Sequence, residues 1–222
     1  MLIDTVPFRK GGNRFFEETM KEVEKKARVS RQMFESVKQE LTISYGSPEH
    51  ILAQDFYYTM PPLKKGDKNR FRIRKNYSGD PLQLQSIVVN SKRKQTIFGN
   101  LENNVEHEFT LCDEAAIDSF SEMMSDFGAK AWYNKSKDKY VFVAVEDVEY
   151  HIELCTLPIR GVDEHFLEIE GIYPEGLSET EERAKNKAID DFITAVFRRF
   201  GIEKSVETCP YRKLMGVEYP KD

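Results

Sequence analysis

The sequence predicts an α+β protein: a closed antiparallel β-barrel with a charged interior and flanking helices. Three observations lead to this prediction. Many short segments alternate apolar and charged residues with the two-residue period of a β-strand. Far fewer segments show the longer period of an amphipathic helix. Several strand segments also repeat charges of one sign on one face, which is unfavourable unless something compensates them.

The composition is that of one charge-rich globular domain. The chain has 222 residues, of which 40% are hydrophobic and 32% are charged, and its net charge is -5. This near balance gives no support to nucleic acid as a general partner. The first residues lack the apolar core of a secretory signal, and no apolar run approaches the ~20 residues that span a bilayer. We therefore expect no membrane partner. The chain has three widely spaced cysteines, Cys112, Cys155 and Cys209, which cannot all pair and form no C-x-x-C motif, so we expect a reducing, cytoplasmic location.

Three helices are predicted, and each has a residue that can cap its first turn. Ser178 and Glu181 have the spacing of a capping box, and Gly201 stands where a helix often ends. Ser30 and Asp113 can cap the other two helices. Each helix has one apolar face, which must cover part of a sheet. The helices are expected at residues 31–41, 114–127 and 179–200.

Most of the remaining chain is predicted to form β-strands. Many short strands with few helices favour a barrel or a sandwich over alternating strand–helix units. Residues 1–20 are interpreted as an N-terminal extension and residues 21–216 as the domain. The strands are expected at residues 22–29, 53–58, 70–76, 83–92, 105–111, 131–135, 139–145, 147–155 and 165–173.

Charges at alternate positions are the main evidence for an enclosed interior. They could lie on the solvent face of an open sheet, but such a face usually mixes signs with neutral polar residues. Here single strands carry doubled carboxylates or doubled arginines, while the opposite faces are apolar and need the helices as cover. We therefore expect the charges to point inward. The sets are Glu22, Glu24, Lys26 and Arg28; Arg70, Arg72 and Arg74; Glu106 and Glu108; Lys135 and Lys137; Glu149, His151 and Glu153; and Glu168 and Glu170.

An interior of this kind needs ions to balance it. Carboxylates held close together cannot all ionise cheaply without a cation between them. Oxygen ligands favour Mg²⁺ or Mn²⁺. Inward arginines and lysines favour a polyanion, because guanidinium groups match phosphate oxygens. A metal beside basic residues is the requirement of phosphoryl chemistry.

The order of short motifs resembles that of the CYTH family, also called triphosphate tunnel metalloenzymes. The resemblance covers about residues 22–215, and the ordered set is far more specific than any single motif. The segment Glu22–Lys26 resembles the family's E-x-E-x-K strand, and Phe166–Glu170 closely matches its F-L-E-I-E. Similar matches in the same order are Asp55–Tyr58 to D-x-Y-Y, Phe71–Arg74 to L-R-I-R, Lys92 to a lysine after the next strand, Glu106–Glu108 to E-x-E, Lys135–Tyr140 to K-x-R-x-x-Y and Cys209–Met215 to S-Y-x-x-L-L.

The resemblance implies an eight-stranded tunnel, a divalent metal and a substrate that carries a triphosphate. It implies metal ligation by Glu22, Glu24, Glu168 and Glu170, with Glu153 where the family usually has aspartate. Either Glu153 or Glu170 would be the catalytic base. It implies phosphate binding by Lys26, Arg72, Arg74, Lys92, Lys135 and Lys137, with Glu106 and Glu108 as further acidic residues of the tunnel.

Three features depart from the family pattern. The segment Tyr58–Pro61 lacks the aspartate of the family's D-T-P. Lys137 replaces an arginine, so a bidentate phosphate contact is not expected there. About twenty residues precede the first strand, which usually starts near the N-terminus.

The leading hypothesis is metal-dependent hydrolysis of tripolyphosphate, thiamine triphosphate or a nucleoside triphosphate. One alternative is an adenylyl cyclase of the class IV type, which would convert ATP to cyclic AMP and pyrophosphate. Two others are an RNA 5′-triphosphatase and a non-catalytic binder of nucleotides or polyphosphate. The many carboxylates argue against the binder, because they contribute nothing to holding an anion. A homodimer is expected from the resemblance alone.

Overall fold

The computed structural model describes residues 20–61, 70–98 and 101–220 of the chain, with the side chains of all these except residues 92–106. The predicted N-terminal extension therefore lies outside the described residues, apart from Met20, which begins the first strand. The elements are β1 (Met20–Val29), α1 (Arg31–Tyr45), β2 (Glu49–Thr59), β3 (Arg70–Ser78), β4 (Gln83–Phe98), β5 (Leu101–Leu111), α2 (Glu114–Asp126), β6 (Lys130–Val145), β7 (Glu149–Ile159), β8 (Val162–Pro174), α3 (Glu179–Arg199), η1 (Glu203–Ser205) and α4 (Tyr211–Leu214).

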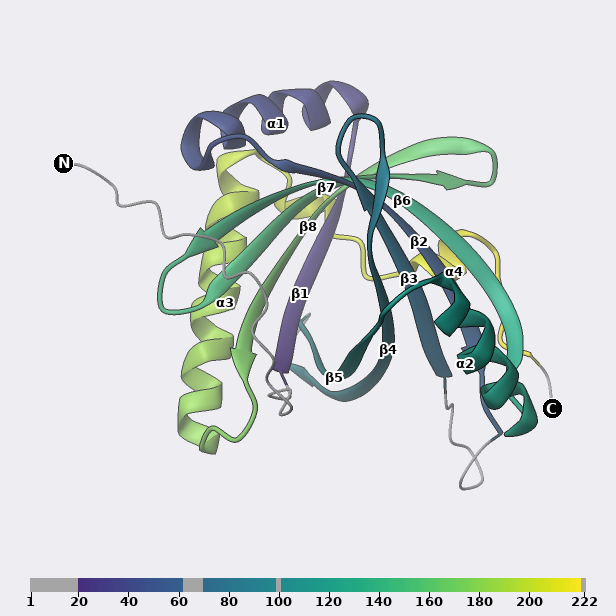
Figure 1. The fold of residues 1–222 in the computed structure, drawn as a ribbon. Helices are drawn as coiled ribbons and strands as arrows, with labels where there is room; N and C mark the ends of the chain where they lie inside the picture. Colours follow the sequence, from purple (N-terminus) through teal and green to yellow (C-terminus); the bar gives the residue numbers. More distant parts are fainter. Residues whose placement is uncertain (1–19, 62–69, 99–100, 221–222) are drawn as a thin grey trace.

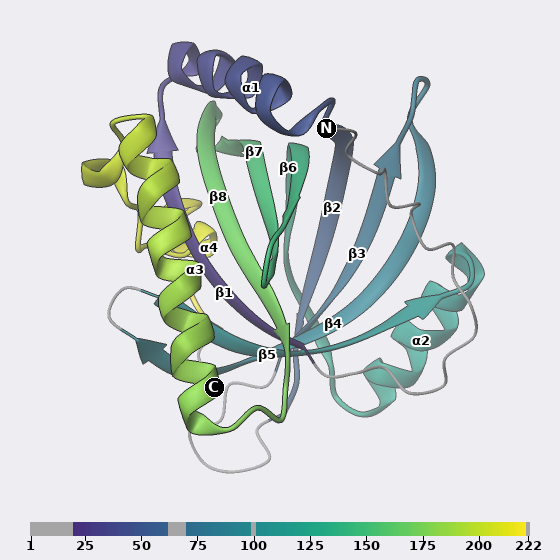
Figure 2. The ribbon, with the colours of Figure 1, turned by 90° about the vertical axis from the view of Figure 1, so that its left-hand side faces the viewer.

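The strands form one deeply curled antiparallel sheet (Figures 1 and 2). Its pairing order is β1-β5-β4-β3-β2-β6-β7-β8, and β8 pairs again with β1. The β1–β5 ladder is the shortest in the sheet: among the described residues it joins only Met20–Glu24 to Glu102–Glu106. The α+β class and the eight antiparallel strands are thus confirmed. The closed barrel that the sequence predicts is borne out only in part: the strand order returns to β1 through one short ladder, the β1–β5 seam, and the curled sheet has the shape of a half-barrel.

Beyond that seam, the C-terminal part of the chain covers the free edge of β1. The backbone N–H of Glu207 donates to the Lys26 carbonyl at 2.8 Å, and Ala27 forms an antiparallel bridge with Val206. These contacts lie on the edge opposite β8, since β8 already pairs with β1 over its whole length.

Helices α1 and α3 cover the convex face of β1, β6, β7 and β8. Their apolar stripes, which include Phe34, Val37 and Ile193, are buried in one core with Val23 and Leu167 of the sheet. The approach of α3 is close at Gly171, where a Cβ atom would lie 2.6 Å from Ile189 Cγ1. The Ile189 side chain of α3 can therefore pack this closely only because residue 171 of β8 is a glycine.

Two smaller cores complete the packing. On the convex face of β3 and β4, α2 packs through Phe120 and Met124 against Phe71 and Ile73. At the β7–β8 end, α4 brings Tyr211, Leu214 and Met215 onto an apolar cluster. That cluster consists of Cys155, Leu157 and Ile159 of β7 and Phe166 of β8. Cys155, Leu157 and Ile159 alternate with Leu154, which packs with the convex core, so α4 lies over the concave face.

The predicted helices all form, with their predicted caps. Ser30 and Asp113 accept from the backbone at Met33 and Ala116, and Ser178 with Glu181 makes the capping box. No helix among the described residues has the length and apolar character needed to cross a membrane.

One strand prediction is wrong. Residues 131–135 and 139–145 were expected as two strands, but they form the single strand β6. The segment Ser136–Asp138 is polar on both faces, so it lacks the apolar alternation that marks a strand. Its backbone nevertheless pairs with β2 without interruption.

Candidate active site on the concave face

The charged side chains with period two lie on the concave face of the sheet. On β1, Val23 and Ala27 are fully buried in the convex core, so Glu22, Glu24 and Lys26 project to the other side. The same alternation applies along the neighbouring strands. It places there Arg72 and Arg74 of β3, Lys135, Lys137 and Lys139 of β6, His151 and Glu153 of β7, and Glu168 and Glu170 of β8.

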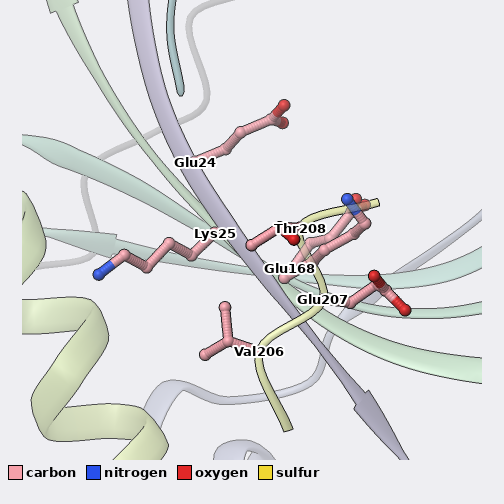
Figure 3. Close-up of a pocket in the computed structure, with 7 residues that line it drawn as sticks. Glu24, Lys25, Glu168, Val206, Glu207 and Thr208 are labelled. Carbon is pink, nitrogen blue, oxygen red and sulfur yellow. The ribbon is translucent and has the colours of Figure 1, made fainter. Parts of the chain in front are cut away.

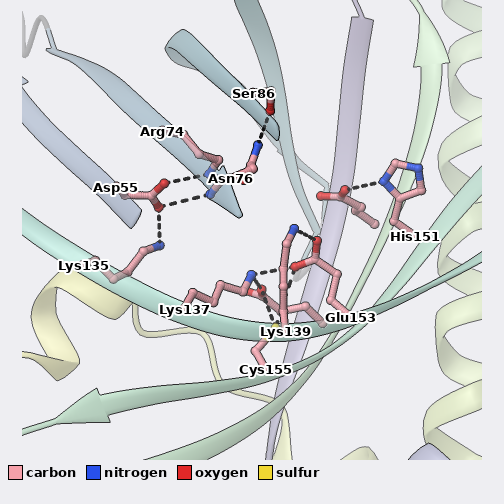
Figure 4. Close-up of polar contacts among 12 residues, drawn as sticks. Asp55, Arg74, Asn76, Ser86, Lys135, Lys137, Lys139, His151, Glu153 and Cys155 are labelled. Atoms are coloured by element: carbon pink, nitrogen blue, oxygen red, sulfur yellow. Dashed lines mark hydrogen bonds and ion pairs between the residues drawn. The ribbon is translucent and has the colours of Figure 1, made fainter. Parts of the chain in front are cut away.

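Asp55 of β2 organises the cations of β3 and β6 (Figure 4). Its side chain is fully buried, and Arg74 donates to it from Nε at 2.6 Å and from Nη2 at 3.1 Å. Lys135 Nζ lies 3.2 Å from Asp55 Oδ2, and Arg72 Nη1 lies 3.8 Å from the same oxygen. Burial alone would raise the pKa of Asp55, but the three cations hold it well below its ordinary value. One carboxylate among three cations leaves positive charge in excess.

Glu153 and Glu168 form a second group with two lysines. Lys137 Nζ donates to Glu153 Oε2 at 2.7 Å and also to Glu168, and Lys139 donates to the other oxygen of Glu153. Cys155 Sγ lies 3.7 Å from Glu153 and 3.6 Å from Glu168. Burial opposes ionisation of Glu153, but the two ammonium groups hold its pKa well below the ordinary value. We call these five residues the lysine–carboxylate group.

Glu22, Glu24 and Glu170 form a third group, which we call the acidic trio. One carboxylate oxygen from each lies within 4.8 Å of the others, and Glu24 is opposite Glu170 in the β1–β8 ladder. His151 Nδ1 lies 3.0 Å from Glu170 and its Nε2 lies 2.8 Å from Glu149. Burial lowers the pKa of His151, but hydrogen bonds and charge from the two carboxylates outweigh burial and raise it to about 9. At neutral pH this imidazolium donates to both carboxylates.

A small pocket joins these groups to the C-terminal segment (Figure 3). Glu24, Lys26 and Glu168 line it from the sheet, and Glu207 and Thr208 line it from the segment that follows the edge of β1. Glu24 and Lys25 point to opposite sides of β1, as strand alternation requires.

Solved structures share this architecture. The PH1819 protein of Pyrococcus horikoshii superposes with a TM-score of 0.62 at 20% identity, covering 87% of this chain and 97% of its own. A Vibrio parahaemolyticus protein, described as a candidate adenylate cyclase, gives 0.60 at 17% identity, with 88% and 98% covered. The Hippeastrum protein HpAC1, a candidate adenylyl cyclase described as having a dominant triphosphatase activity, gives 0.57 at 13%, with 90% and 98% covered. These neighbours are CYTH-type triphosphate tunnel proteins.

The chain shares the fold of these triphosphate tunnel proteins. The likeness covers nearly the whole length of each neighbour. No protein-family model and no curated protein sequence matches the chain. At these identities the likeness establishes the fold, and the chemistry has to be argued from the residues of this chain.

The acidic trio fits a hard divalent ion within the triphosphate tunnel fold. It offers three carboxylates, and Mg²⁺ and Mn²⁺ prefer oxygen ligands. Glu153, Cys155 and Glu168 are also close enough to share an ion, but their two carboxylates already hold Lys137 and Lys139. The five carboxylates that the sequence assigns to metal are thus divided between two settings.

Some predicted site residues lie apart from these groups. Glu108 is exposed and accepts from Asn90 Nδ2 at 2.6 Å, and it belongs to neither carboxylate group. The side chains of Lys92 and Glu106 lie outside the described residues. Their backbones face each other in the β4–β5 ladder.

Sequence reasoning missed several residues of the site, among them Lys139, Asp55 and Tyr211. Lys139 continues the period of Lys135 and Lys137, but the expected break in β6 concealed it. Asp55 appeared only as part of a motif, without a signal that it would be buried among cations. Tyr211 comes from the distant C-terminal segment, and its ring lies 5.2 Å from both Lys26 Nζ and Lys135 Nζ.

Proposed function

We propose that the chain is a divalent-metal-dependent triphosphatase, which hydrolyses the terminal phosphoanhydride of an inorganic or organic triphosphate. The observation that carries the proposal is the division of the concave face. Arg72, Arg74 and Lys135 form a cationic wall on β3 and β6, and the acidic trio lies across the curl on β1 and β8. A chain of phosphates needs cations along its oxygens, and the bond that breaks needs a metal nearby.

The residues of the cationic wall would bind and orient the substrate. The guanidinium forks of Arg72 and Arg74 match phosphate oxygens, and Lys135 adds a point charge. Because Asp55 fixes Arg74 and Lys135 before substrate arrives, little conformational freedom is lost when they bind. An ion held by the acidic trio would supply charge neutralisation at the reacting phosphate.

Glu170 is the better of the two candidate bases. It would take a proton from water while the water oxygen bonds to the terminal phosphorus and the bridging P–O bond breaks. The bridging oxygen and its electron pair leave with the diphosphate, and the terminal group is released as phosphate. Glu153 is the poorer candidate because both of its oxygens already accept from Lys137 and Lys139, which leaves neither oxygen to take a proton from water. His151 fixes the orientation of the Glu170 carboxylate through its 3.0 Å contact.

A nucleotide cyclase is the second candidate. The neighbour from Hippeastrum, a candidate adenylyl cyclase with a dominant triphosphatase activity, supports keeping both reactions in view and placing hydrolysis first. Both reactions need the same grip on a triphosphate. They differ in whether water or the ribose 3′-hydroxyl attacks, and in whether phosphate or pyrophosphate leaves.

One screen tests the proposal. Tripolyphosphate, thiamine triphosphate, ATP and 5′-triphosphate RNA are each incubated with the protein and Mg²⁺ or Mn²⁺, and the products are identified by chromatography. We expect phosphate and the matching diphosphate from at least one substrate. Cyclic AMP with pyrophosphate would establish the cyclase instead, and tight triphosphate binding without turnover would establish a binder.

Two matched variants tie the activity to the site. Glu24→Gln should lower the rate by about 100-fold or more, since even the outer partners of a metal ligand cost 10–100-fold when lost. Glu179→Gln, the same change at an exposed residue of α3, should leave the rate unchanged. Equal rates in the two variants would contradict the proposed site.

A further inference from the structure

Lys139 is a site residue that the family resemblance does not assign. It lies on the concave face of β6, is 8% exposed and faces Cys155 in the β6–β7 ladder. Its ammonium donates to one oxygen of Glu153, while Lys137 donates to the other. Each oxygen of this buried carboxylate therefore already has a cation.

We infer that Lys137 and Lys139 occupy the place of a second divalent ion, so that Glu153 is their counter-ion and the tunnel binds one metal ion, at the acidic trio. This inference rests on the proposed metal-dependent function. It concerns how many ions this chain binds and which carboxylates bind them.

Charge balance in the lysine–carboxylate group is the first argument. Two carboxylates, Glu153 and Glu168, face two ammonium groups, so the ionised side chains there sum to zero. A divalent ion would add two positive charges beside two ammonium groups in a buried setting, where such repulsion is strong. It would also have to displace the hydrogen bonds that Lys137 and Lys139 make.

The donor atoms give an independent argument. The third atom that could ligate an ion in this group is the Cys155 sulfur, a soft ligand that suits Zn²⁺ or Cu⁺ rather than Mg²⁺ or Mn²⁺. The acidic trio offers carboxylate oxygen from all three members. A hard ion should therefore choose the trio.

Titration with Mn²⁺ alone, without substrate, tests the inference by calorimetry and by electron paramagnetic resonance. We expect one Mn²⁺ per wild-type chain. Glu24→Gln should abolish that binding, whereas Glu153→Gln should leave the stoichiometry at one and the Kd within about threefold. A tenfold or greater loss of affinity in Glu153→Gln, or two ions per wild-type chain, would overturn the inference.

Removing both ammonium groups tests the role of the lysines directly. In Lys137→Met/Lys139→Met, Glu153 and Glu168 lose their cations, and we expect a second Mn²⁺ to bind and to raise the melting temperature. If this double variant folds and still binds only one ion, the proposed role of the lysines is refuted. If that variant does not fold, Lys139→Met/Glu153→Gln removes both members of one pair, and it should keep the single site.

A control substitution is available, and the outcomes distinguish a failure of this inference from a failure of the proposed function. Lys25→Met, the same change on the convex side where Lys25 pairs with Asp190, should leave Mn²⁺ binding unchanged. If the protein binds two ions and hydrolyses a triphosphate, the inference would be contradicted and the proposed function would be supported. If the protein binds one ion, if Glu153→Gln leaves that binding unchanged, and if no triphosphate is hydrolysed, the inference would stand and the proposed function would fail.

Discussion

At the scale of single residues, the interior depends on charges that are buried only because they are paired. Asp55 has no exposed surface, yet it remains ionised because Arg74, Lys135 and Arg72 surround it. A buried ion pair contributes little net stability, but losing one partner leaves the other charge uncompensated. These residues therefore fix the arrangement of the site more than they stabilise the fold.

Asp55→Asn should lower the free energy of unfolding by about 3–5 kcal/mol, because it leaves three cations in the interior without their carboxylate counter-ion. The change also has a pH signature. The folded pKa of Asp55 is depressed, so its contribution is present above the unfolded pKa of about 3.9 and is lost as pH falls through the folded value. Urea unfolding from pH 2 to 7 should show a shallower acid loss in the variant. A variant as stable as wild type at pH 7 would contradict this account.

His151 gives a pH dependence of the opposite sign. Its folded pKa of about 9 lies above the ordinary value of 6.5, so its stabilisation is complete below pH 6.5 and is lost as pH rises through 9. With some discount for its partial exposure, the loss should be on the order of 2 kcal/mol. Urea unfolding in EDTA between pH 6 and 10 measures it, and His151→Gln should lack this component. NMR titration of the imidazole below pH 7 would refute the assignment.

At the scale of elements, the C-terminal segment acts as a strap across the curled sheet. It pairs with β1 at Ala27, and its far end reaches β3 and β6. There Arg70 donates to the Tyr219 hydroxyl at 2.8 Å and Trp132 Nε1 donates to the Glu218 carbonyl at 2.9 Å. The strap thus links the two sides of a sheet whose own seam is short.

The contact between α3 and β8 is the second point at this scale, and Gly171 controls it. Gly171→Ala would place a Cβ atom 2.6 Å from Ile189 Cγ1, so α3 must move away. Overpacking of this kind costs about 1–3 kcal/mol, measured as a lower free energy of unfolding in urea. The smaller partner in Gly171→Ala/Ile189→Ala should accept the new methyl. The double variant should then lose less than the sum of the two single changes, and strict additivity would contradict the close contact.

At the scale of the whole molecule, local patterns predicted the strands and the placement of their charges, and distant contacts escaped prediction. Glu22, Glu24 and Glu170 share a face because alternation is a local property of each strand. The union of residues 131–135 and 139–145 into β6 was missed because Ser136–Asp138 has no apolar face. The short seam, the strap and the position of Tyr211 depend on contacts between segments far apart in sequence, for which a single sequence contains no signal.

The same scale supports a last prediction, that the two sides of the half-barrel bind different ligands. Lys135→Met on the cationic wall should weaken tripolyphosphate binding in EDTA by about tenfold or more, since it removes a charged hydrogen bond of about 1.5–3 kcal/mol. It should leave the affinity for Mn²⁺ alone nearly unchanged. Glu22→Gln should do the opposite: it should weaken Mn²⁺ binding, and it should leave tripolyphosphate binding in EDTA unchanged or tighter because a negative charge is gone. Calorimetry of both variants with both ligands gives four measurements, and parallel losses of both ligands in both variants would mean that the walls do not act separately.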